Sequence, residues 1–300
     1  MVCEHKKRNY SEALLVDTFA LASTGNGLCA VAAGLVGTAL VDNFGILAPP
    51  IFTILPLLVV IAVVMLTWTE NFGDQSISYC GSLGAAWSAI QDNQFIALLG
   101  ITQSAFQGAM YIFVFAWTPA LESPITDTKL PHGLIFSTFM AAVMLGGSLF
   151  SLYTKIFDKD KAASLLPLAV HFGATAAMLW SSYGYNHKVS VLCAFLFFEL
   201  CCGVFFPVAG LLRSVYIPEQ SRAGVMNLFR LPLNAVVVIL LLLSQQKEAG
   251  HEVHMLYSCA VLHLVGLVCY FLFVTLKTAT SKSDHSVRKG PRSRGQTKPA

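Results

Sequence analysis

Charged residues are scarce in this sequence. They make up 12% of its 300 residues and hydrophobic residues 55%, whereas a soluble globular domain carries roughly 25% charged residues. Enzyme motifs are missing as well, because the sequence contains no HExxH, no GxSxG, no phosphate-binding glycine loop and no dinucleotide fingerprint. The eight cysteines show no metal-ligand spacing. The scarcity of charged residues excludes a soluble fold. From the missing motifs and the missing metal-ligand spacing we expect no catalytic residues, no metal and no cofactor, and we also expect no nucleic-acid partner.

Apolar residues gather in eight runs of about twenty, the length that a helix needs to cross a hydrocarbon core of about 30 Å. Each run is expected to be helical, because lipid cannot satisfy an open backbone. The expected spans cover residues 19–41, 46–68, 95–117, 133–153, 163–183, 189–211, 223–243 and 256–276. The sequence therefore predicts an all-α, multi-pass integral membrane protein.

Lysine and arginine residues are distributed unevenly between the two sides of these spans. One side carries the basic N-terminal segment, the loops near residues 155–161 and 213–222, and the basic tail. The other side carries only Lys129, Lys188 and Lys247. Because loops rich in lysine and arginine stay in the cytosol, we predict that both termini are cytosolic.

The longest internal connection divides the expected spans into a unit of two and a unit of six. The expected segments are a cytosolic N-terminal segment (1–18), a two-span unit (19–68), a cytosolic linker with a helix along the membrane surface (69–94), a six-span unit (95–276) and a basic, disordered cytosolic tail (277–300). The linker combines apolar and polar residues in the manner of an interfacial helix.

Polar side chains inside the spans are the candidates for function, because ionisable groups at membrane depth are energetically expensive. Gln103, Gln107 and Tyr111 lie four residues apart and therefore share one face of the third span. Glu199 lies near the middle of the sixth span, and Asn26 lies between two glycines in the first.

The seventh span carries the strongest pattern, with Asn227, Arg230 and Asn234 on one helix face. Two interpretations are open. In one, these polar faces line an aqueous cavity and bind a polar solute, and the fixed charge and donor fork of Arg230 favour an anion. In the other, Glu199 pairs with Arg230 and the amides only hold neighbouring helices together.

Three stretches then point to a family: Trp117-Thr-Pro-Ala-Leu121, Pro131-His-Gly133, and Asn227-Leu-Phe-Arg-Leu-Pro-Leu-Asn234. With them, and with weaker matches over roughly residues 4–276, the sequence resembles the molybdate-anion transporter family of the major facilitator superfamily. The resemblance implies uptake of an inorganic oxyanion, molybdate first, by alternating access in the plasma membrane. The first span of this sequence aligns with the fifth of the superfamily's twelve helices. We therefore expect an N-terminally truncated chain whose two-span unit is a remnant of the N-terminal bundle.

The resemblance also implies roles for the polar residues. Arg230 would pair with the oxyanion, Asn227, Asn234 and Asn26 would donate hydrogen bonds, and Glu199 would position Arg230 or respond to protons. The helices that line the cavity in that superfamily include those that carry these side chains and Gln103. The sequence departs from similar sequences at Gln107, where they carry a glutamate, and this weakens the expectation of proton coupling there.

Two alternatives stay open. The chain is a truncated, non-transporting membrane protein or partner subunit, whose exposed helix faces are covered by another helix bundle or by a second copy. Alternatively, it carries a different small solute, such as sulfate or a sugar, because the fold suits these equally well. In each case the lipid bilayer surrounds the helices.

Overall fold

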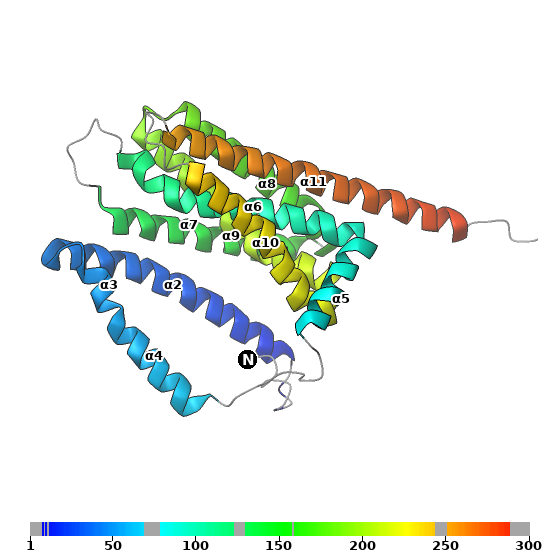
Figure 1. The fold of residues 1–300 in the computed structure, drawn as a ribbon, viewed down its shortest axis with the longest axis horizontal. Coiled ribbons are helices and arrows are strands. Elements are labelled where there is room, and N and C mark those ends of the chain that lie inside the picture. Colours follow the sequence, from blue (N-terminus) through cyan, green and yellow to red (C-terminus); the bar gives the residue numbers. More distant parts are fainter. Residues whose placement is uncertain are drawn as a thin grey trace, which may run out of the picture.

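The structure, a computed structural model, describes residues 8, 10, 12–68, 79–122, 130–157, 159–243 and 251–288. Every regular element in this part of the chain is a helix, and eight candidate spans are long and apolar enough to cross a membrane. The helices are α2 (Glu12–Phe44), α3 (Ala48–Phe52), α4 (Ile54–Thr67), α5 (Tyr79–Asp92), α6 (Gln94–Glu122), α7 (His132–Ile156), α8 (Lys159–Tyr183), α9 (Lys188–Tyr216), α10 (Glu219–Leu243) and α11 (His251–Arg288). The prediction of an all-helical protein with eight membrane spans is confirmed (Figure 1).

Helices α6 to α11 form one bundle (Figure 1), in which α9 packs against α7 and α8, and α11 against α6 and α8. Its interior is rich in aromatic rings, and those of Phe106 and Phe205 stack at a centroid distance of 3.7 Å. The large side chains that are completely or almost completely buried include Phe106, Phe113, Phe139, Phe195, Phe198, Tyr270 and Phe273. These rings hold the bundle together by packing, which is the main force between helices in lipid.

The contact between α7 and α9 depends on glycines. A Cβ atom added at Gly203 would overlap the backbone of Val143, and one added at Gly146 would overlap the backbone of Leu200 and Gly203. Small residues let two helix backbones approach closely and gain dispersion contacts along their length. Neither position therefore has room for a side chain.

Helix α2 packs against α7 through small residues of the same kind. The Ser137 hydroxyl lies 2.9 Å from the carbonyl oxygen of Val31, and a Cβ atom at Gly34 would overlap Ser137 and the Gly133 carbonyl. This contact attaches the first span to the six-helix bundle (Figure 1). The division into a two-span unit (α2 to α4) and a six-span unit (α6 to α11) stays a prediction.

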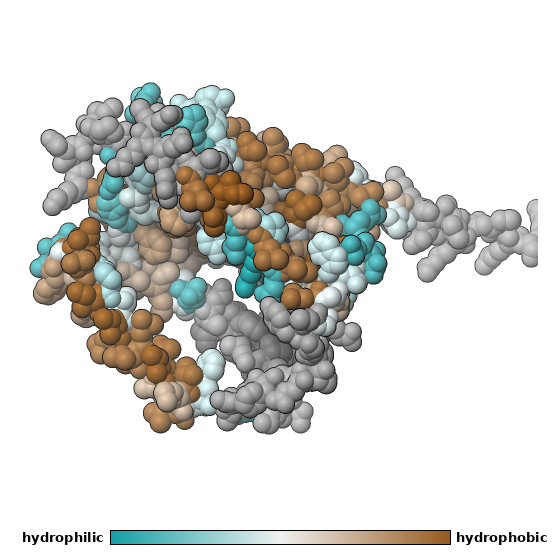
Figure 2. Space-filling view, in the orientation of Figure 1, coloured by the Kyte–Doolittle hydropathy of each residue, from teal (hydrophilic) through white to brown (hydrophobic). Residues whose placement is uncertain are grey.

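The expected span 46–68 differs from the structure, because it is divided into α3 and α4 at Thr53. The ring of Pro56 would clash with the carbonyl of Phe52 in a continuous helix, and Pro56 has no N–H to donate there. In the first turn of α4 this N–H is not needed. No residue of α4 is buried, and Figure 2 shows its apolar surface exposed along its length.

Two boundaries also differ from the expected segments. Helix α2 begins at Glu12, within the expected N-terminal segment, and α11 continues to Arg288, into the segment expected to be disordered. The residues after the apolar run include no glycine or proline before Gly290, and such residues are what usually ends a helix. Helix α5 lies within the expected linker, and its place along the membrane surface stays a prediction. Residues 1–7, 69–78 and 289–300 lie outside the described residues.

Candidate functional site

The polar face of α10 is exposed near the middle of the helix. Asn227, Arg230 and Asn234 all have exposed side chains on this face, and Figure 2 shows hydrophilic residues over the middle of α10. Among the described residues, the guanidinium of Arg230 has neither a hydrogen bond nor an ion pair. An arginine at membrane depth needs an aqueous space or an anionic partner, so this face has the chemistry of an anion site.

The polar face of α6 changes from buried to open along the helix. Gln103 is 2% exposed, Gln107 is half-buried and Tyr111 is 46% exposed. Neither the amide nitrogen nor the amide oxygen of Gln103 has a hydrogen-bond partner among the described residues. A buried amide without a partner loses its hydration without compensation, and such groups usually bind water or a ligand.

A hydrogen bond joins these two helices at the level of the polar residues. The Ser104 hydroxyl donates to the carbonyl oxygen of Phe229 at 2.8 Å. Gln103 and Arg230 each neighbour one of the bonded residues in sequence, so they lie at the same depth in the bundle. The structure thus brings the polar residues of α6 and α10 onto two adjoining helices.

Glu199 does not pair with Arg230, as the second interpretation of the sequence supposed. It is 8% exposed on α9, and no ion pair links it to Arg230 within the part of the chain that the structure describes. An ion pair recorded there joins His132 Nε2 to Glu122 Oε1 at 2.7 Å, away from the middle of the spans. A direct salt bridge from Glu199 therefore does not position Arg230.

Asn26 lies apart from this pair of helices. Its side chain is exposed on α2, which packs against α7, whereas α10 packs against α5 and α6. The structure therefore groups the candidate residues of α6 and α10, and leaves Asn26 and Glu199 on α2 and α9.

His171 and His263 meet in the core of the bundle. His171 Nδ1 lies 3.2 Å from the carbonyl oxygen of His263, and the two rings are 5.9 Å apart beside Phe106. A local sequence pattern cannot reveal the pair, because the residues lie on α8 and α11, far apart in sequence. Among the described residues, no group of three or more His, Cys, Asp or Glu side chains is placed to hold a metal ion.

These features define the described part of the chain as a multi-pass helical membrane protein that carries an exposed arginine and amides near the middle of its spans. Residues 1–184 match a family model described as sugar transporters with twelve transmembrane segments. The chain therefore belongs to this family. The family is part of the major facilitator superfamily, which is the superfamily that the sequence motifs predicted.

Curated relatives carry a more specific name. The molybdate-anion transporter of Xenopus tropicalis is 34% identical over 280 residues, which cover 91% of this chain and 61% of that protein. The molybdate-anion transporter of Takifugu rubripes is 30% identical over 296 residues, covering 86% and 61%, and that of Danio rerio 34% over 213 residues, covering 67% and 43%. The chain therefore spans at most 61% of the length of these relatives.

Proposed function

We propose that the chain takes part in the uptake of an inorganic oxyanion, molybdate, by alternating access. The observation that carries this proposal is the guanidinium of Arg230, which lies between two amide side chains near the middle of α10 and has no partner among the described residues. The relatives named molybdate-anion transporters support the same substrate. A fixed positive charge favours an anion over a neutral sugar of similar size.

The proposed roles follow from charge and hydrogen-bonding capacity. Arg230 binds the oxyanion through its donor fork, and Asn227 and Asn234 donate hydrogen bonds from the same helix face. The unpartnered amide of Gln103 donates from α6 at the same depth. Glu199, a buried carboxylate on α9, responds to protons during the transport cycle instead of holding Arg230.

Two further residues from the sequence belong to the wider cavity in this proposal. Gln107, half-buried on α6, extends the polar face from Gln103 toward Tyr111, and Asn26 contributes from α2 when the helices rearrange. Both termini face the cytosol and the protein resides in the plasma membrane. The basic residues Lys155 and Arg213, in the last turns of α7 and α9, support this orientation.

Uptake by proteoliposomes that contain the purified chain tests the substrate class. Labelled molybdate is expected to accumulate. Tungstate, which matches molybdate in charge, tetrahedral shape and size, is expected to compete with it more strongly than sulfate, which has the same charge and shape but is smaller. A neutral sugar is expected not to compete. Accumulation of a sugar without accumulation of molybdate would contradict the proposal and favour the sugar carrier.

A further inference from the structure

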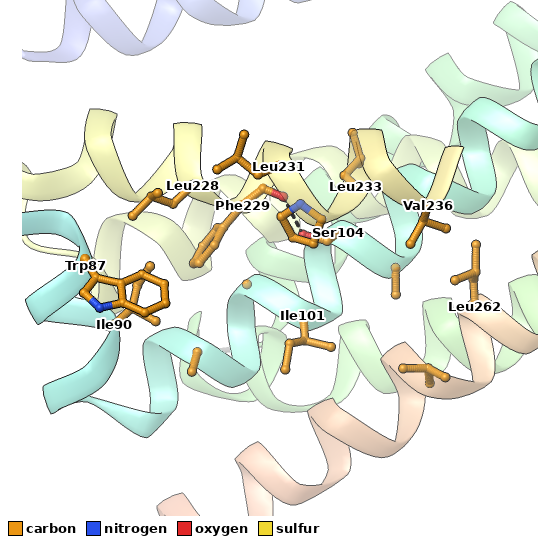
Figure 3. A pocket seen from close by; sticks show the side chains of 15 residues that line it. Trp87, Ile90, Ile101, Ser104, Leu228, Phe229, Leu231, Leu233, Val236 and Leu262 are labelled. Carbon is orange, nitrogen blue, oxygen red and sulfur yellow. Dashed lines mark hydrogen bonds between the residues drawn. The ribbon is translucent and has the colours of Figure 1, made fainter. Parts of the chain in front are cut away.

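The structure contains a pocket that is not part of the proposed transport site. It lies between α5, α6, α10 and α11 and has a volume of about 520 Å³, within the range of about 300–1,000 Å³ that is usual for ligand pockets. Its lining is almost entirely apolar, and Figure 3 shows Trp87, Ile90, Ile101, Leu231 and Val236 around it.

The lining of this pocket offers few polar groups to a ligand. The hydroxyl of Ser104, which lines the pocket, donates to the carbonyl oxygen of Phe229 (Figure 3). The other lining residues have apolar side chains, except for the indole N–H of Trp87 at one end. A polar solute that entered would lose its hydration without gaining hydrogen bonds, so the pocket excludes an oxyanion or a sugar.

The pocket lies at the depth of the bilayer hydrocarbon. Gly100 and Ala105, which form part of its wall, are about 9–16 Å along α6 from its start at Gln94, at 1.5 Å per residue. Ile101 and Val265 are 48% and 43% exposed, so the pocket opens on the outer surface of the bundle. Apolar chains of membrane lipid are the molecules that surround a multi-pass protein at this depth.

The ring of Phe229, which lines the pocket, lies against Gly100 of α6. Gly146 and Gly203 bring the backbones of α7 and α9 together, whereas at Gly100 the ring of Phe229 stands between α6 and α10. Phe229 and Leu233 of α10 line the pocket, whereas Arg230 and Asn234 of the same helix do not. An occupant of the pocket therefore packs against both α6 and the helix that carries the polar face.

We propose that this pocket binds one acyl chain of a membrane phospholipid, which enters between α6 and α10 with its headgroup end near Trp87 on α5. Trp87 suits this position, because tryptophan side chains favour the level of the lipid headgroups. The chain fills the space beside Gly100 and packs against Phe229. The pocket is thus a lipid site, separate from the polar face that we assign to the transported anion.

Photolabelling of the full chain in lipid vesicles tests this proposal. The probe is a phosphatidylcholine with a diazirine in the middle of one acyl chain, present as a small fraction of the lipid. After irradiation, the labelled peptides are identified by mass spectrometry. Pocket residues such as Ile101 and Leu231 are expected to be labelled several-fold more than Leu57 and Val59 on α4, which are similarly exposed.

Two matched variants distinguish labelling inside the pocket from labelling of the general lipid-facing surface. Ala97→Phe fills the pocket that Ala97 lines and is expected to remove the excess labelling while leaving the labelling of α4 unchanged. Ala141→Phe, on the exposed surface of α7, is expected to leave the excess in place. If Ala97→Phe fails to fold, the test rests on the unchanged chain, in which the labelling of pocket residues is compared with that of α4 residues.

Two results would overturn the proposal. Labelling in proportion to exposure, with no excess at the pocket, would show that only the surrounding lipid reaches it. Loss of the pocket labelling on addition of an equal amount of sterol, with α4 labelling unchanged, would assign the pocket to a rigid ring system instead of an acyl chain.

Discussion

Replacement of Gly203 by alanine tests the packing that holds the bundle together. The added methyl group would overlap the carbonyl oxygen, carbonyl carbon and Cα of Val143 on α7. These are backbone atoms and cannot rotate away like the end of a flexible side chain, so α7 and α9 must move apart. Gly37→Ala in α2 is the matched control, because no heavy atom among the described residues lies within 4 Å of the Cβ position there.

The size of the effect follows from two opposing contributions. Alanine is more favourable than glycine inside a helix by about 0.8–1.0 kcal/mol, and this gain applies to both variants. Overpacking costs about 1–3 kcal/mol and applies only to Gly203→Ala. We therefore expect the free energy of unfolding of Gly203→Ala to be about 1–3 kcal/mol lower than that of Gly37→Ala.

Unfolding in mixed micelles with a rising fraction of denaturing detergent, followed by tryptophan fluorescence, measures this difference. Because about 1.4 kcal/mol is a tenfold change in an equilibrium constant, the expected difference is well within reach of the assay. Equal stability of the two variants would show that α7 and α9 are not in backbone contact at Gly203, and the reasoning about this helix pair would be wrong.

Three further predictions concern contacts and charges elsewhere in the chain. Ser104→Ala removes the hydrogen bond to Phe229 and is expected to lower the free energy of unfolding by about 0.6 kcal/mol, measured in the same assay. Gly34→Val is expected to push α2 away from Ser137 on α7, which spin labels on the two helices would report as a longer distance, and an unchanged distance would contradict the packing described. Glu199→Gln, which keeps the side-chain shape but cannot ionise, is expected to make molybdate uptake less dependent on external pH, and an unaltered pH profile would remove Glu199 from the proposed proton response.

The eight spans were predictable from the sequence because the bilayer imposes a fixed length on each apolar run. The division of the second span was not foreseen. In a continuous helix the ring of Pro56 would clash with the carbonyl of Phe52, and the helix restarts at Ile54. By contrast, Pro207 and Pro232 lie within the continuous helices α9 and α10.

The candidate site was predictable in part. Spacing along one helix correctly placed Asn227, Arg230 and Asn234 on one face, because helix geometry fixes such relations. Spacing carries no information about which helices are neighbours, so the supposed Glu199–Arg230 pair was wrong. The contact between α6 and α10 at Ser104 has no local sequence signal either.

The apolar pocket could not be inferred from the sequence at all. Its lining comes from four helices, and residues such as Ile101, Leu231 and Val265 are the same types that face lipid anywhere on the bundle. Only the packing of α10 against α6 distinguishes them. That packing includes the ring of Phe229 beside Gly100, a contact between residues far apart in sequence.

The uptake of labelled molybdate by Arg230 variants in proteoliposomes tests the central claim most directly. Arg230→Ala is expected to abolish uptake while the protein remains folded in the membrane, and Arg230→Lys is expected to keep only part of it, because lysine retains the charge but not the planar donor fork. Lys155→Ala, which removes a positive charge from the end of α7, is the control and should transport normally. Unchanged uptake by Arg230→Ala would exclude Arg230 from the site and contradict the proposed function of the α10 polar face.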